Sequence, residues 1–87
     1  MTLEFPNRSR SFDEVRNAVR FIGHDGMFEV PFFVETTALA RHSGVQLTEA
    51  DFLMAFDSAR ASIHDVAREA YSNVRRTSYT LTAADFR

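Results

Sequence analysis

A hairpin signal around Asp25-Gly26 constrains the fold of this chain most. Two strand-like runs, residues 19–24 and 27–34, flank that dipeptide, which suits a two-residue type I′ turn because both central residues accept positive φ. Counting outward from the turn pairs His24 with Met27 and Phe21 with Val30. The sequence therefore predicts an antiparallel hairpin at the centre of the domain.

This register gives the hairpin two unlike faces. One face is apolar and carries Val19, Phe21, Phe28, Val30, Phe32 and Val34. The opposite one, called the outer hairpin face below, carries Arg20, Ile22, His24, Met27, Glu29, Pro31 and Phe33. The N–H that Pro31 lacks falls at a ladder position in this register, so we expect a bulge or the end of pairing there.

Shorter elements are expected before the hairpin. Residues 3–5 have the pattern of a strand, and residues 7–10 form a polar loop. Ser11-Phe12-Asp13-Glu14 has capping-box spacing, followed by at most one helical turn.

Helices and a last strand are expected after the hairpin. Residues 35–42 predict a short helix that ends before Gly44. Thr48 and Asp51 form a capping-box variant, and an apolar stripe with steps of three and four predicts one unbroken helix from residue 48 to about 74. The pattern of residues 77–81 predicts a last strand.

These elements predict an α+β fold of 87 residues in a single domain, 1–87. It has two layers: a mostly antiparallel sheet of about four strands, in the chain order β-β-β-α-α-β, with two helices on one face. The expected core is Phe5, Val19, Phe21, Val30, Phe32, Leu39, Phe52, Phe56, Ile63, Ala67 and Leu81.

Charge and composition exclude several classes of protein. Ten arginines face twelve acids in even mixture, for a net charge of −2, whereas nucleic-acid binding needs a concentrated basic face. The chain has no cysteine for a disulfide, a thiolate zinc site or a thiol nucleophile. It has neither a secretory signal nor an apolar run of about 20 residues, so we expect a cytoplasmic location and no membrane contact.

Chemistry-bearing motifs are equally sparse. The sequence has no P-loop, no G-x-G-x-x-G and no G-x-S-x-G, so no cofactor is expected. His24, His42 and His64 lack metal-ligand spacing, so no metal is expected either. No catalytic residue can be named, which favours a protein that is not an enzyme.

Two groups of residues are candidates for binding. Arg60, His64 and Arg68 follow one another at i, i+4 and i+8; they suit an anion-binding groove or, alternatively, a solvated helix face paired with neighbouring acids. Ile22, Met27 and Phe33 make the outer hairpin face too apolar for a solvated surface. They predict an interface, most simply in a homodimer, unless a helix end or residues 7–12 cover that face.

Further features tie the chain to a known family. They are Phe5-Pro6, Val19-x-Phe21, Gly26, Ala38-Leu39 followed by Gly44, Phe56-x-x-x-Arg60-x-x-Ile63-x-x-x-Ala67, and Leu81 with Asp85. With these features the chain resembles a small bacterial family known as a domain of unknown function, DUF 1488. The resemblance implies a compact α+β fold and no established activity. The family pattern often has Trp where this chain has Phe12, and Cys where it has Pro31, which weakens a catalytic role for the third strand.

The function that these observations favour is a non-catalytic binding, regulatory or protein-interaction module of a bacterial cytoplasm. One alternative is weak nucleic-acid binding through arginines. The other is a small enzyme with a site near Arg60 and His64.

Overall fold

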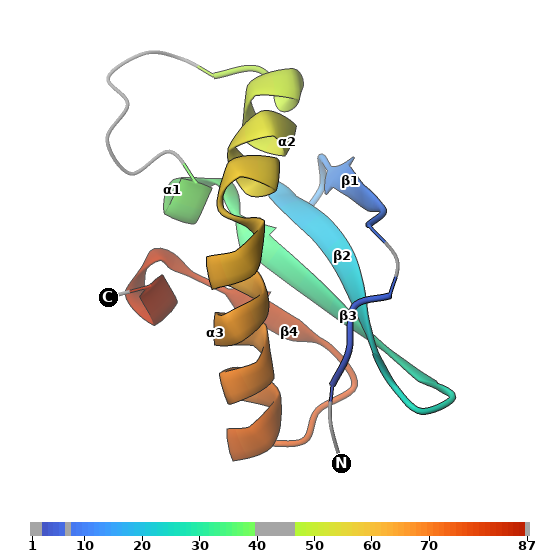
Figure 1. The fold of residues 1–87 in the computed structure, drawn as a ribbon. Coiled ribbons are helices and arrows are strands. Elements are labelled where there is room, and N and C mark those ends of the chain that lie inside the picture. The colour runs from blue at the N-terminus through green and yellow to red at the C-terminus, as the bar shows by residue number, and fades with distance from the viewer. Residues whose placement is uncertain (1–2, 7, 40–46, 87) are drawn as a thin grey trace.

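Four strands and the helices that follow the third strand make up the fold (Figure 1). The computed structural model describes residues 3–6, 8–39 and 47–86. The elements are β1 (Arg10–Asp13), β2 (Ala18–Asp25), β3 (Phe28–Glu35), α1 (Thr36–Leu39), α2 (Glu49–Ser58), α3 (Arg60–Asn73), β4 (Tyr79–Leu81) and the 3₁₀ helix η1 (Ala83–Phe86).

The sheet is mixed but mostly antiparallel. Its strand order is β1-β2-β3-β4; β1 pairs with β2 and β2 with β3 in antiparallel fashion, while β4 lies parallel to β3. The last pair is parallel because the chain returns to the sheet through the helices. The predicted α+β class and the order β-β-β-α-α-β are confirmed.

The β2–β3 turn lies one residue later than predicted. Asp25 pairs with Phe28, so Gly26 and Met27 are the two turn residues. Gly26 has a φ of 62° at the first turn position, where a type II′ turn places glycine. The predicted register is therefore wrong by two residues. Both faces keep their residues, because an even shift does not exchange the faces of a strand.

The later turn also explains why pairing continues through Pro31. Glu4 and His24 exchange both backbone hydrogen bonds, at 2.8 and 2.7 Å, so the peptide groups of His24 point away from β3. Hydrogen-bonded and non-bonded pairs alternate along an antiparallel ladder. The Ile22–Pro31 pair is consequently a non-bonded one, and the expected bulge or end of pairing is wrong.

The N-terminal elements also differ from the prediction. Of residues 3–5, only Glu4 joins the sheet, through an isolated bridge to His24. Arg10–Asp13 forms β1 where a loop and a helical turn are predicted. The side chain of Asp13 accepts a hydrogen bond from the backbone N–H of Arg16 at 3.0 Å. It therefore stabilises the β1–β2 turn rather than the start of a helix.

The predicted long helix breaks at Ala59. The capping box of Thr48 and Asp51 starts α2 as predicted, but Ala59 has φ −106° and ψ 13°, and its N–H is shared between the carbonyls of Ala55 and Phe56, both at 3.1 Å. The α1 helix covers the first part of the predicted helix 35–42. The remainder, with His42 and Gly44, lies outside the described residues.

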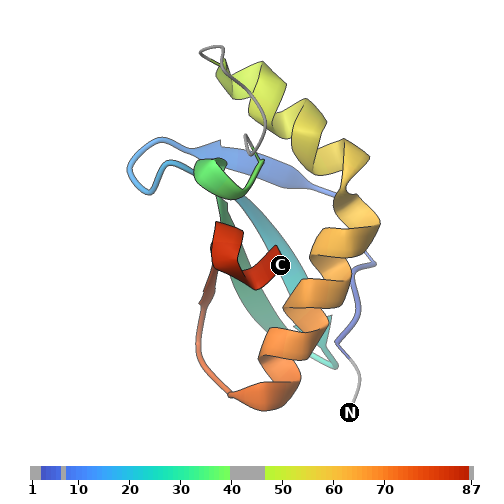
Figure 2. The same cartoon turned by 90° about the vertical axis from the view of Figure 1, so that its left-hand side faces the viewer.

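Both α2 and α3 lie on the apolar face of the hairpin, as Figures 1 and 2 show from perpendicular directions. Eight of the predicted core residues are buried, including Phe56, Ile63 and Ala67, while Phe5, Leu39 and Phe52 are partly buried against the core. Leu3, Tyr71 and Tyr79 belong to the core as well. Within the described part of the chain, no helix has both the length and the apolar character needed to cross a bilayer.

Candidate functional site

Among the hollows that described residues line, two contain the candidate site residues, and they lie at different places along α3. The first, called the arginine pocket here, has a volume of about 450 Å³ and lies at the junction of α2 and α3. It is lined by Phe5, Arg8, Asp57, Ser58, Arg60, Ala61 and His64. The second adjoins the β2–β3 turn and the C-terminal end of α3.

Arg60 is the most enclosed cation of the arginine pocket. Its Nη2 lies 2.8 Å from Oδ1 of Asp57, and its Cζ lies 4.9 Å from the centre of the Phe56 ring. The side chain is only 11% exposed. Its Nε is buried and has no hydrogen-bond partner among the described residues, so one N–H donor of this guanidinium is unsatisfied there.

Asp57 is held by a second arginine as well. Arg10 in β1 donates from Nε at 3.0 Å and from Nη2 at 2.8 Å to its two carboxylate oxygens. The hydrogen bond from Arg10 is the main cause that lowers the pKa of Asp57, with Arg60 adding to it. The one carboxylate that lines the pocket is thus already shared between two guanidinium groups.

His64 stacks on Phe5 with ring centres 3.9 Å apart and planes at 6°. Its pKa is lowered from 6.5 to about 4, mainly by burial and in addition by the charges of Arg60, Arg68 and Arg8, against the weaker effect of Asp65. The imidazole is therefore neutral at pH 7.

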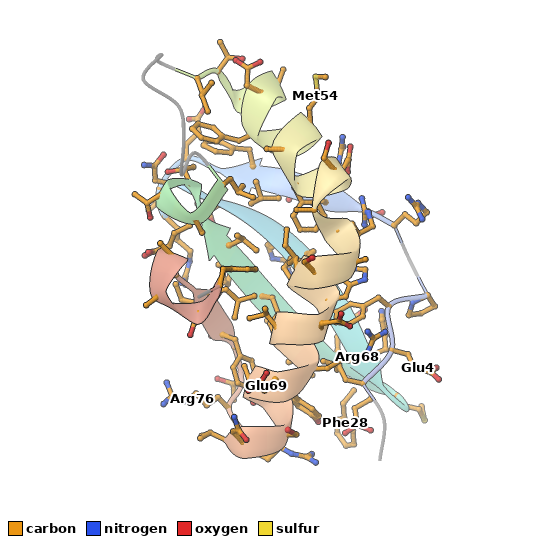
Figure 3. The ribbon with its side chains drawn as sticks, turned by 60° about the vertical axis from the view of Figure 1, so that its left-hand side comes forward. Glu4, Phe28, Met54, Arg68, Glu69 and Arg76 are labelled. Atoms are coloured by element: carbon orange, nitrogen blue, oxygen red, sulfur yellow. The ribbon has the colours of Figure 1, made fainter. Side chains whose placement is uncertain are left out.

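Arg68 completes the row predicted on this helix face. Its Nε donates to the backbone carbonyl of Leu3 at 3.2 Å, its Nη1 lies 3.4 Å from Asp65, and its Cζ lies 5.1 Å from the centre of the Phe5 ring. Figure 3 shows Arg68 on the side of α3 that faces the N-terminal segment. The fold thus brings Arg60, His64 and Arg68 together against that segment, and pairs two of them with acids.

The second hollow is called the hairpin-tip surface. It has a volume of about 320 Å³ and is lined by Phe28, Glu29, Val30, Tyr71, Arg75, Arg76 and Thr77. Phe28 is 74% exposed and its turn neighbour Met27 is 98% exposed. Figure 3 shows Phe28 and Arg76 at the same end of the molecule, near the end of α3.

A buried acid contacts two residues that line the hairpin-tip surface. Asp25 is 5% exposed and accepts a hydrogen bond of 2.5 Å from the hydroxyl of Tyr71. Arg75 donates to the same hydroxyl at 3.0 Å and lies 3.5 Å from the Asp25 carboxylate. The hydrogen bond to Asp25 is the main cause that raises the pKa of Tyr71.

The motifs and spacings of the sequence did not predict this cluster, although one signal for it was present. Asp25 follows Val19 and Phe21 on the apolar face of β2 by alternation. An acid on an apolar face needs a buried partner. Tyr71 near the end of α3 and Arg75, which lies just beyond that helix, are that partner pair.

The outer hairpin face does not gather its predicted interface residues into one exposed patch. Phe33 is 7% exposed, with the Arg16 guanidinium 4.2 Å above its ring, and Ile22 is half-buried. Residues 10–13 extend the sheet rather than cover this face, and α2 and α3 lie on the opposite face. Met27 is the exposed member of the three, and it belongs to the turn.

No group of three or more potential metal ligands occurs among the residues that the structure describes. His24 takes part in the bridge with Glu4, and His42 lies outside the described residues.

A small α+β domain with a mostly antiparallel four-stranded sheet, backed by a broken helix, is the class that this fold defines. The model of one family, described as "Protein of unknown function (DUF1488)", matches residues 3–82. The chain belongs to this family, as the sequence resemblance predicts. No curated protein matches the chain, and no solved structure does so.

Proposed function

We propose that this protein is a non-catalytic protein-interaction module whose hairpin-tip surface binds a short segment of a partner protein. The observation that carries this proposal is the exposure of Met27 and Phe28 beside a hollow in which Arg75 is held in place by Tyr71. Large exposed apolar groups that adjoin a hollow are typical of interaction sites. Met, aromatic residues and Arg are also the types enriched at the centres of interfaces.

Arg75 supports the proposal because its position is set before any partner arrives. Its guanidinium lies 4.2 Å from the centre of the Tyr71 ring and donates to the hydroxyl of that residue. A side chain already held in its bound conformation loses less entropy on association. Arg75 can therefore present its remaining donors to a partner at low cost.

The charges of the lining indicate the partner's chemistry. Arg75 and Arg76 line the hollow together with one acid, Glu29. Arg75 also lies 3.5 Å from the buried carboxylate of Asp25, whereas Arg76 has no ion pair among the described residues. A segment with a carboxylate next to an apolar side chain complements this arrangement, since Arg binds carboxylates and Phe28 and Val30 offer apolar contact.

The edge of β3 offers backbone contacts at the same place. Pairing with β4 begins at Phe32. Hydrogen-bonded and non-bonded pairs alternate between β2 and β3, and the pairs of Glu29 and Pro31 are both non-bonded. The backbone N–H and C=O of Glu29 therefore point away from β2. These groups face an edge that β4 does not reach. An extended partner segment can pair with them as an added strand.

Site-specific photo-crosslinking tests the proposal. A photoreactive phenylalanine analogue at position 28 should give a discrete adduct with one host protein, and Arg76→Glu should weaken the adduct because it reverses a charge of the lining. The same analogue at position 15 is the matched control, since Val15 is almost fully exposed in the β1–β2 turn. Equal adducts from both positions, or an adduct indifferent to Arg76→Glu, would contradict the proposal. An adduct of two copies of this chain would replace the partner by a homodimer.

The two alternatives from the sequence are nucleic-acid binding and a small enzyme. A gel shift at about 150 mM salt tests nucleic-acid binding, because an interaction that depends on phosphate contacts weakens steeply with salt. Submicromolar binding under those conditions would rank nucleic acid above a protein partner. An enzyme near Arg60 and His64 would need a free acid–base pair, whereas Asp57 and Asp65 are both paired with arginines.

A further inference from the structure

We propose that the arginine pocket binds the phosphate monoester group of a small molecule, held by Arg8, Arg60 and His64. The proposal is independent of the hairpin-tip surface, which has different lining residues. It rests on the charge balance of the pocket, on an unused buried donor and on the position of the imidazole.

Positive charge exceeds negative charge around this pocket. Arg10 and Arg60 share the carboxylate of Asp57, and Arg68 pairs with Asp65. Arg8 lines the pocket and has no ion-pair partner among the described residues. Four arginines therefore meet two carboxylates, and the surplus charge lies where Arg8 and Arg60 face the same hollow.

Arg60 adds a donor for which the described residues supply no acceptor. Its Nε is buried without a hydrogen-bond partner in the described part of the chain, although buried polar groups are nearly always paired. Arg60 lines the pocket, but because its Nε is not exposed, an acceptor bound there would satisfy this donor only after the guanidinium turns toward it. A phosphate offers three acceptor oxygens and can reach several guanidinium groups at once.

The imidazole of His64 is placed to complete the site. Stacking on Phe5 fixes the plane of the ring, and the ring lines the pocket. The charged groups around it are Arg60, Arg68 and Asp65 from α3, Asp57 from α2, Arg10 from β1 and Arg8 from the N-terminal segment.

The distribution of the other arginines favours a small ligand over a nucleic acid. Arg16 covers Phe33 on the outer hairpin face, and Arg75 and Arg76 line the other hollow. A nucleic acid needs a continuous track of cations along its backbone, and the described arginines form separate groups instead. A pocket of about 450 Å³ suits one phosphate with a small organic group.

The experiment is an NMR titration of the histidine side chains with inorganic phosphate and with adenosine monophosphate, at constant ionic strength in chloride. Phosphate in the pocket should raise the pKa of His64 by about one unit or more, because a nearby anion favours the charged imidazole. His24 is the internal reference, since alternation along β2 places it on the outer hairpin face. An unchanged His64, or equal shifts of both histidines, would overturn the proposal.

Matched variants test which arginine acts. Arg8→Gln removes an exposed cation of the pocket and should weaken phosphate binding about tenfold. Arg20→Gln removes an exposed cation on the outer hairpin face and should leave binding unchanged. Equal losses from both variants would indicate only a general charge effect and would contradict the site. Tighter binding of a single-stranded oligonucleotide than of the mononucleotide, lost with Arg8→Gln, would make the ligand a nucleic acid and overturn the small-molecule assignment.

Discussion

His64 and Asp25 are polar side chains that the fold withdraws from water on the apolar side of the sheet. Asp25 is stabilised because Tyr71 and Arg75 satisfy its carboxylate. His64 has no such partner among the described residues; it stacks on Phe5 near the positive charges of Arg60, Arg68 and Arg8. At the residue scale, these two side chains therefore fit their surroundings in different ways, Asp25 through polar partners and His64 as a neutral, stacked ring.

The protein should become less stable as the pH falls below about 6.5, because of His64. Its pKa is about 4 in the folded chain against 6.5 ordinarily, so below about pH 6.5 the unfolded chain takes up a proton that the native state refuses until about pH 4. Allowing for partial exposure, the free energy of unfolding should drop by about 1–2 kcal/mol more in wild type than in His64→Phe between pH 7 and pH 4.5. Urea denaturation at both pH values measures this difference. Parallel losses in the two proteins would contradict it.

Phe56 is a core residue whose truncation should cost much of the stability. It is fully buried, and its ring lies 5.2 Å from that of Phe21. Phe56→Ala should lower the free energy of unfolding by about 3–5 kcal/mol, through lost burial and a cavity. Met54→Ala, on the same helix but exposed, should change it by less than about 0.5 kcal/mol. A similar loss from both variants in urea titrations would refute the packing described here.

At the scale of elements, the N-terminal segment and the β2 strand depend on close contact. A Cβ built on Gly23 would lie 3.0 Å from Leu3 Cδ1 and 3.0 Å from Phe5 Cε1. The segment therefore packs directly on the bare backbone of β2, which holds Phe5 against His64. This contact links the sheet to the arginine pocket.

Gly23→Ala should weaken both the fold and the pocket. Overpacking against Leu3 and Phe5 should cost about 1–3 kcal/mol of unfolding free energy, and displacement of Phe5 should bring the pKa of His64 back toward 6.5. Denaturation and the histidine titration measure the two effects on one sample. A stable variant whose His64 pKa stays low would show that the segment accommodates the methyl group without moving.

At the scale of the whole molecule, the described residues form an elongated body of 40 × 24 × 23 Å with a radius of gyration of 12.5 Å. In the part of the chain that the structure describes, helices cover one face of the sheet and none lies on the other. On that uncovered face, Arg16 shields the largest apolar side chain, Phe33. A homodimer through Phe33 would have to displace this contact.

We therefore expect the purified protein to be a monomer at high micromolar concentration, with Phe33→Asp changing stability rather than mass. Placing a carboxylate at this buried position should destabilise the fold by at least about 2 kcal/mol. Light scattering and circular dichroism measure the mass and the fold. A wild-type dimer that Phe33→Asp converts into a folded monomer would establish the interface on the outer hairpin face instead.

The sequence by itself determined the features that depend on local periodicity. Alternation assigned the faces of β2 and β3 correctly even though the turn was misplaced, because the faces survive a shift of two residues. The helical stripe placed Phe56, Ile63 and Ala67 in the core, and the capping box marked the start of α2. The row of Arg60, His64 and Arg68 followed from helical spacing alone.

Tertiary structure decided what depends on contacts between distant segments. The strand at Arg10–Asp13 forms by pairing with β2, and Phe12 packs on Phe52 at 5.9 Å, neither of which a local pattern encodes. Phe5 and Arg8 reach the arginine pocket, and Asp25 reaches Tyr71, across more than 40 residues of chain. The side chains of one helix or strand are placed by its own repeat, whereas a site made from several segments exists only after the core has fixed their relative positions.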